Sequence, residues 1–160
     1  MGLGTGLSPF APGTAGSALG LALAWFLART LSATSPSLTA VVGLLMSGLL
    51  VGLAGVASST RTARVLGAED PGCIVIDEIA GQLLASAAVP LFRYPTWRVE
   101  ALAWLASFFL FRFFDVWKPG VVRRLQDLPE GWGIVADDIA AGLLAAGCVA
   151  AAASLLGWWP

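Results

Sequence analysis

The feature that most restricts the fold is an uncharged run of twenty residues from Leu38 to Ala57. A helix needs about 20 apolar residues to cross a hydrocarbon core of ~30 Å, so this run predicts a membrane-spanning helix. Four further apolar segments cover roughly residues 15–31, 74–92, 99–114 and 137–159. The chain is therefore predicted to be all-α, a polytopic membrane helical bundle with about four to five hydrophobic segments.

Composition supports a membrane protein and limits its chemistry. Charged residues make up 12% of the chain, against about 25% in an ordinary soluble domain, and its 160 residues suffice for a single domain, residues 1–160. The absence of histidine excludes Ser-His-Asp triads, His-based phosphatases and His-ligated zinc or haem. With a net charge of −1 and no long Lys/Arg run, no nucleic-acid partner is expected. Hydrolytic chemistry would have to use carboxylates, Lys, Arg, hydroxyls or oxygen-ligated metals.

Three charged residues interrupt the aromatic end of the fourth apolar segment. Arg112, Asp115 and Lys118 follow one another at intervals of three residues. On a helix this spacing places them on one face. Arg and Lys could be an interfacial anchor that reaches to the water, but an anchor leaves Asp115 unexplained. The alternative is that the three residues belong to a charged functional site.

The N-terminal residues 2–17 are rich in Gly, Pro, Ser and Thr and lead into the first apolar segment. Such loops bring backbone N–H groups together and can bind an anion at a helix start. Thr14 or Ser17 could contribute to a phosphate site, although capping of the helix would explain either residue equally well. The glycines match neither the dinucleotide fingerprint nor the Walker pattern.

Two acidic stretches of the chain resemble each other at an offset of 60 residues. Residues 74–85 and 134–145 are identical at eight of twelve positions, and each contains two adjacent acids. The pairs are Asp77 with Glu78 and Asp137 with Asp138. Each pair is expected near a helix N-terminus, where the helix dipole favours negative charge. Capping accounts for one acid per helix but poorly for two.

The predicted topology places these features on one face. If the N-terminus is inside and the five segments alternate, the N-terminal loop, both acid pairs and the charged residues of the fourth segment all lie inside. The inner side then receives six cations and the outer side three, which agrees with the positive-inside rule. The inner cations are Arg61, Arg64, Arg112, Lys118, Arg123 and Arg124, and the outer ones are Arg29, Arg93 and Arg98.

Clustered carboxylates without His or paired Cys match a hard divalent cation such as Mg²⁺. Arg112 and Lys118 could hold a phosphate, and a carboxylate or a metal-bound water could serve as base or nucleophile. The expected class is metal-assisted phosphoryl chemistry on a substrate reached from the membrane surface. Alternatively, Asp77, Asp137 and Asp138 could relay protons in a transporter. That alternative leaves the cations and the N-terminal loop without a role.

Four motifs occur in order along the chain: GTGLSPFAPGTAGS (residues 4–17), IDE (76–78), FRFFDVWKP (111–119) and GIVADDIAAG (133–142). Together they resemble the phosphatidylglycerophosphatase A family. The resemblance implies a Mg²⁺-dependent, multi-pass lipid phosphatase of the bacterial inner membrane with a cytoplasmic active site. Its substrate would be a phospholipid within the bilayer, and it would hydrolyse phosphatidylglycerol phosphate to phosphatidylglycerol and inorganic phosphate. The chain departs from the family pattern at residues 120–122 and 130–133.

The resemblance also implies a role for each polar residue of the motifs, and these roles fall into three groups. Thr14, Ser17, Arg112 and Lys118 would bind the substrate phosphate, Asp77, Glu78, Asp137 and Asp138 would bind the metal, and Asp77, Asp115 and Asp138 would be catalytic. Either a covalent aspartyl-phosphate or direct attack by metal-bound water is compatible with these residues. The sequence gives no indication of the number of metal ions, the oligomeric state or the selectivity among lipid phosphates.

Overall fold

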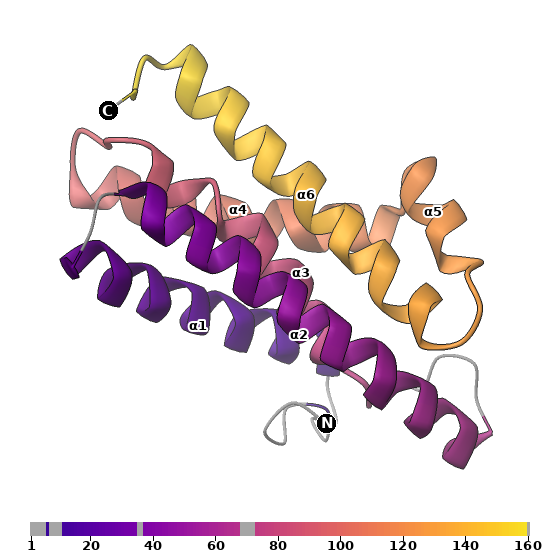
Figure 1. Ribbon diagram of the computed structural model, residues 1–160. Coiled ribbons are helices and arrows are strands. Elements are labelled where there is room, and N and C mark those ends of the chain that lie inside the picture. The colour runs from indigo at the N-terminus through magenta and orange to yellow at the C-terminus, as the bar shows by residue number, and fades with distance from the viewer. Residues whose placement is uncertain (1–5, 7–10, 35–36, 68–72, 160) are drawn as a thin grey trace.

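A computed structural model describes residue 6 and residues 11–34, 37–67 and 73–159, and this part of the chain is helical without any strand (Figure 1). The all-α prediction is therefore confirmed. The helices are α1 (Pro12–Thr34), α2 (Ser37–Leu66), α3 (Ile76–Ser86), α4 (Trp97–Trp117), α5 (Val121–Gln126) and α6 (Gly131–Leu155), with a short 3₁₀ helix η2 (Val89–Leu91) between α3 and α4.

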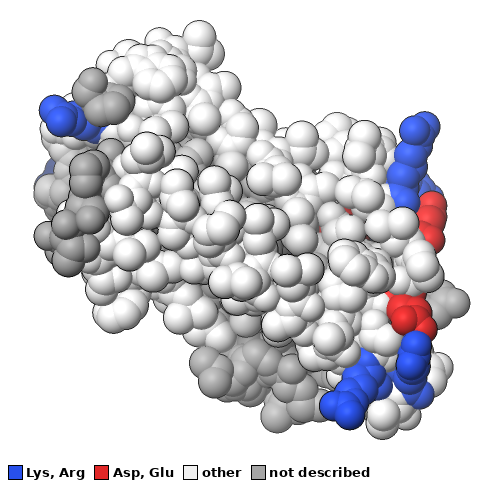
Figure 2. Space-filling view, in the orientation of Figure 1, with Lys and Arg blue, Asp and Glu red and all other residues white. Residues whose placement is uncertain are grey.

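Among the described residues, three helices are long and apolar enough to cross a bilayer, and their spans are Pro12–Ser32, Leu38–Thr62 and Gly131–Leu155. On the face shown in Figure 2, the charged side chains gather at the two ends of the molecule and a wide uncharged surface separates them. Exposed Phe26, Leu50 and Leu53 contribute to the apolar surface of the spans. In water this surface would be unfavourable, whereas lipid chains can cover it.

The predicted segment 74–92 does not form one helix. Helix α3 has only 11 residues, a length of about 16 Å, which is too short to span a bilayer alone. It ends at Ser86, and Pro90 lies in the 3₁₀ turn that follows. Proline has no amide hydrogen to donate and therefore does not continue an α-helix.

Helix α3 is the centre of the bundle and packs against α1, α2, α4 and α6. The close approach depends on glycine, because a Cβ on Gly142 of α6 would lie 2.3 Å from the carbonyl oxygen of Gly81 in α3. Gly20 of α1 and Gly48 of α2 allow similar approaches to Gln82 and Leu84. Small residues at these crossings let helix backbones pack closely, as is common in membrane proteins.

Three other boundaries differ from the sequence-based expectation. Helix α1 begins at Pro12, so Thr14 and Ser17 lie inside the helix and do not cap it. Pro119 and Gly120 predict a loop after the fourth apolar segment, but residues 123 and 124 belong to α5. Asp137 and Asp138 lie in the second turn of α6, where the helix dipole is weak. The Pro71-Gly72 pair, which the sequence predicts to form a turn before Asp77, lies outside the described residues, as does most of the N-terminal loop.

Candidate active site

The predicted polar residues meet at one end of the bundle. The first turns of α1 and α3, the end of α4 and the second turn of α6 converge there. The acid pairs and the Arg112–Lys118 stretch therefore lie at the same end of the bundle, as the sequence predicts. Helix packing produces it, because α3 contacts each of the other three helices.

Three carboxylates form the innermost part of this site. One oxygen each of Asp77, Glu78 and Asp138 lies within 4.8 Å of the others. Asp77 and Asp138 are only 6% and 4% exposed, so their charges are largely removed from water. Glu78 Oε2 is also buried and accepts no hydrogen bond from the described residues. Such a set of oxygen donors, with a buried oxygen still unpaired, fits a hard divalent cation.

Asp137 is the predicted metal ligand that the structure does not bring into this cluster. Its Oδ2 accepts a hydrogen bond from Lys118 Nζ at 2.6 Å, and its Oδ1 accepts one from the backbone N–H of Asp138 at 3.0 Å. The two adjacent acids of α6 therefore face different partners. Asp138 faces the other carboxylates, whereas Asp137 holds the lysine.

Arg112 and Asp115 form an ion pair one helical turn apart, with Arg112 Nη1 2.6 Å from Asp115 Oδ2. Arg112 Nη1 also lies 3.4 Å from Ser17 Oγ, which it can donate to, and this contact joins α4 to α1. The carboxyl group of Asp115 interacts in turn with that of Asp138. Asp115 thus lies between the basic residues and the carboxylate cluster.

Lys118 does not continue the helical face of Arg112 and Asp115. It follows the end of α4 in a left-handed conformation with φ 47°, which directs its side chain to α6. This conformation costs a non-glycine residue about 1–2 kcal/mol, so the surrounding contacts must hold it in place. Asp137 provides the strongest such contact.

The surroundings change the pKa of both Glu78 and Lys118, which lie outside the membrane spans, but for different reasons. Burial, and then the neighbouring Asp77, raise the pKa of Glu78 well above its usual range. A divalent cation would act in the opposite direction and favour the carboxylate. Burial by itself lowers the pKa of Lys118, but the hydrogen bond and charge of Asp137 outweigh burial, so the net pKa is raised. Lys118 is therefore a cation at neutral pH.

The two hydroxyl residues of the N-terminal motif lie differently. Ser17 is fully buried, donates to the carbonyl oxygen of Gly13 at 2.8 Å and reaches Arg112. Thr14 is exposed on the first turn of α1, so the structure does not bring it to the charged cluster. Its predicted phosphate contact stays a prediction.

Gly13 is a site residue that the sequence reasoning treated only as part of a loop. A Cβ at this position would lie 2.4 Å from Glu78 Oε1 and 3.3 Å from Arg112 Nη1. The missing side chain therefore leaves room for both charged groups. A glycine directly after the proline that opens a helix was the available signal, because glycine disfavours helix interiors.

A buried polar network next to the site was also missed. Gln82 lies one turn beyond Glu78, and its Nε2 donates to Ser86 Oγ at 3.0 Å and toward Ser107 Oγ at 3.4 Å. All three side chains are fully buried. The signal was an isolated glutamine in an apolar segment, since a buried amide needs partners.

This fold and this site define a class: a polytopic α-helical membrane protein with carboxylates and two cations gathered at one end of its bundle. The chain belongs to the phosphatidylglycerophosphatase A family, whose model matches residues 1–153. It is therefore a phosphatase, and the family resemblance noted in the sequence is confirmed. No solved structure matches the chain significantly.

Three relatives show the breadth of the similarity. Phosphatidylglycerophosphatase A of Escherichia coli is 35% identical over 148 residues, covering 92% of this chain and 77% of the relative. That of Haemophilus influenzae is 36% identical over 149 residues, covering 91% and 80%. A Bacteroides thetaiotaomicron protein, provisionally named a phosphatidylinositol-3-phosphatase, is 34% identical over 156 residues, covering 98% and 92%.

Proposed function

We propose that this protein hydrolyses phosphatidylglycerol phosphate to phosphatidylglycerol and inorganic phosphate, with Mg²⁺, at the cytoplasmic face of a bacterial inner membrane. The names of the Escherichia coli and Haemophilus influenzae relatives support the substrate. The observation that carries the mechanism is the grouping of Asp77, Glu78 and Asp138 beside the Arg112–Asp115 and Lys118–Asp137 pairs.

Asp77, Glu78 and Asp138 would hold the cation. Their oxygens are the ligand type that Mg²⁺ prefers, and a set of three leaves positions for water and phosphate oxygens. When bound, Mg²⁺ supplies positive charge to the phosphoryl oxygens and polarises them. Asp137 would act indirectly by holding Lys118.

Arg112 and Lys118 would bind the phosphate on the more accessible side of the site. Their side chains are 22% and 24% exposed, whereas those of their partners Asp115 and Asp137 are 14% and 5% exposed. Arginine has five N–H donors and lysine three, so each cation can keep its carboxylate and still donate to phosphate oxygens. The two carboxylates would thus orient the donors before substrate arrives.

Two routes for the displacement use the same residues. In one, a carboxylate such as Asp115 attacks phosphorus, the lipid oxygen leaves and takes up a proton to give phosphatidylglycerol, and water later hydrolyses the phosphoenzyme to inorganic phosphate. In the other, a carboxylate accepts the proton of a water that attacks directly. Brief reaction with ³²P-labelled lipid followed by acid quenching separates them, because only the first leaves label on the protein.

The test is an assay of purified protein on phosphatidylglycerol phosphate in mixed micelles. We expect activity with Mg²⁺, loss of activity with EDTA, and a decrease of about 100-fold or more in Asp138→Asn, because that substitution removes one charged ligand. Asp127→Asn is the matched control, since Asp127 is exposed beyond α5. Full activity in EDTA would disprove the metal requirement.

The same assay addresses selectivity and the transporter alternative. Phosphatidate and phosphatidylinositol 3-phosphate serve as competing substrates, the latter because of the Bacteroides thetaiotaomicron relative's name. Preferential cleavage of either would change the proposed substrate. Proton movement in liposomes without cleavage of any lipid phosphate would favour the relay function instead.

A further inference from the structure

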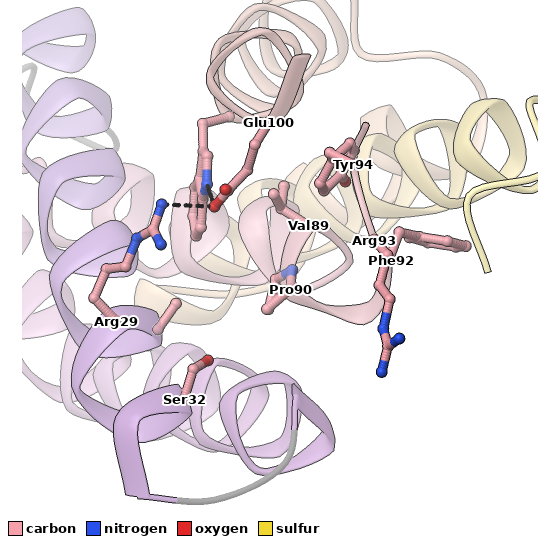
Figure 3. A pocket seen from close by; sticks show the side chains of 10 residues that line it. Arg29, Ser32, Val89, Pro90, Phe92, Arg93, Tyr94 and Glu100 are labelled. Atoms are coloured by element: carbon pink, nitrogen blue, oxygen red, sulfur yellow. Dashed lines mark hydrogen bonds and ion pairs between the residues drawn. The ribbon is translucent and has the colours of Figure 1, made fainter. Parts of the chain in front are cut away.

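A cavity with both polar and apolar lining lies at the opposite end of the bundle from the candidate active site. It has a volume of about 390 Å³ and lies between the end of α1, η2 and the start of α4. Figure 3 shows Arg29 pointing across it toward Glu100, with Tyr94 and Val89 on the side of η2. Cavities of this size commonly hold small molecules.

The cavity is at the level of the other membrane surface. Along α1, the residues from Gly13 at the active site to Ser32 at the cavity span about 28 Å, close to the thickness of a hydrocarbon core. The apolar span of α1 also ends at Ser32. Aromatic rings surround this end, including Tyr94 in edge contact with Trp158 at 5.3 Å between ring centroids. Aromatic residues are enriched at such interfaces.

The lining carries an excess of one positive charge. Arg29 and Arg93 contribute two charges and Glu100 removes one. Glu100 Oε1 already accepts from Arg29 at 2.8 Å and from Trp104 Nε1 at 3.4 Å. Arg93 has no ion-pair partner among the described residues, and Figure 3 shows its side chain extending away from Glu100.

A buried donor also lacks an acceptor. Tyr94 Oη is buried and has no hydrogen-bond partner in the described part of the chain. Burial and then the charge of Glu100 raise the pKa of Tyr94 to about 12, so the hydroxyl keeps its proton at neutral pH. A buried hydroxyl without a partner is unfavourable unless a ligand or water completes it.

We propose that this cavity binds the phosphodiester group of a phospholipid from the leaflet opposite the active site. A phosphodiester has one negative charge, which matches the excess charge of the lining, and oxygen acceptors for Tyr94 Oη and Arg93. The apolar part of the lining, which includes Val89, Pro90 and Phe92, suits the adjoining glycerol and acyl chains. This site does not depend on the proposed substrate, because the length of α1 separates it from the active site.

The experiment measures lipid binding to the purified, delipidated full chain by native mass spectrometry. Dioleoylphosphatidylglycerol, dioleoylphosphatidylcholine and dioleoylglycerol are added at equal concentrations. At least one phospholipid should bind more tightly than dioleoylglycerol, which lacks the phosphodiester. The ranking of the two phospholipids then shows which headgroup the cavity prefers. In Tyr94→Phe and Arg93→Gln that affinity should fall about tenfold.

Arg98→Gln is the matched control, because Arg98 is exposed at the same end and stacks on Trp97 outside the cavity. It should bind lipid as the wild type does. Unchanged helical circular dichroism and phosphatase activity in micelles show that each variant is folded. Equal binding of dioleoylglycerol, or unchanged phospholipid affinity in both cavity variants, would overturn the proposal.

Discussion

At the scale of single residues, Lys118 keeps its position under several unfavourable conditions. Its backbone is left-handed, its ammonium group is partly buried, and its partner Asp137 is buried. Each of these conditions is unfavourable alone, and the ion pair offsets them together. Asp137 thus holds the side chain of Lys118 in place.

Substitution of the pair separates its structural role from the proposed phosphate-binding role of Lys118. Lys118→Met should lower the free energy of unfolding by about 3–5 kcal/mol, because Asp137 is left buried and unpaired. The double variant that carries both Lys118→Met and Asp137→Asn should recover most of that stability but not the activity. Unfolding in mixed micelles and phosphatase assays measure the two effects. Equal stability of the single and double variants would contradict this role, and exposed Arg123→Met is the neutral control.

Substitution of Gly13 should lower activity more than stability. A Cβ in Gly13→Ala would meet Glu78 Oε1, the end of a flexible side chain that can move aside. The helix therefore tolerates alanine, but the carboxylate is displaced from Asp77 and Asp138. We expect activity to fall at least about tenfold and the Mg²⁺ concentration for half-maximal activity to rise. Unchanged activity and Mg²⁺ dependence would show that Glu78 need not stay in this position.

At the scale of elements, the contact of α3 with α6 positions the carboxylates. Gly81 and Gly142 let the two backbones touch, and a Cβ on Gly81 would lie 2.7 Å from the carbonyl oxygen of Asp138. This contact brings the acid pair of α3 next to that of α6. The internal similarity of the two stretches therefore corresponds to a direct packing partnership.

Gly142→Ala tests this contact against a matched change in the same helix. A Cβ at Gly142 would collide with backbone, which cannot move aside, so we expect a loss of about 2 kcal/mol or more of stability together with activity. Gly147→Ala meets nothing within 4 Å and should be neutral or stabilising by up to about 1 kcal/mol. Thermal unfolding in one detergent compares them. Equal melting temperatures would exclude close packing at Gly142.

At the scale of the whole molecule, the two ends differ in charge and chemistry. The end with the carboxylate cluster also carries exposed Arg61, Arg64, Arg123 and Arg124. The other end carries Arg29, Arg93 and Arg98 among aromatic residues. This asymmetry supports the proposed orientation, because cytoplasmic loops are enriched in Lys and Arg.

Accessibility of introduced cysteines measures this orientation in cells. After replacement of Cys73 and Cys148, Gly120→Cys is expected to resist a membrane-impermeant thiol reagent in intact cells, and Pro95→Cys is expected to react. Both positions are exposed, so reactivity reports the side of the membrane. The opposite labelling pattern would place the active site on the outer face.

The sequence by itself determined the class of the fold and the types of side chain available for chemistry. Helix α2 contains the uncharged run Leu38–Ala57, because a membrane-spanning helix satisfies its own backbone hydrogen bonds and needs only apolar side chains. The adjacent acids and the absence of histidine can likewise be read directly from the sequence. The family motifs added the phosphatase activity, which the family match confirmed.

Only the tertiary structure decided which acids face one another. Asp137 and Asp138 are indistinguishable neighbours in sequence, but successive helical residues point about 100° apart, so one joins the carboxylates and the other binds Lys118. The left-handed turn at Lys118 and the cavity beside Tyr94 also depend on contacts between distant segments. Local sequence patterns describe the faces of helices, whereas packing determines which faces meet.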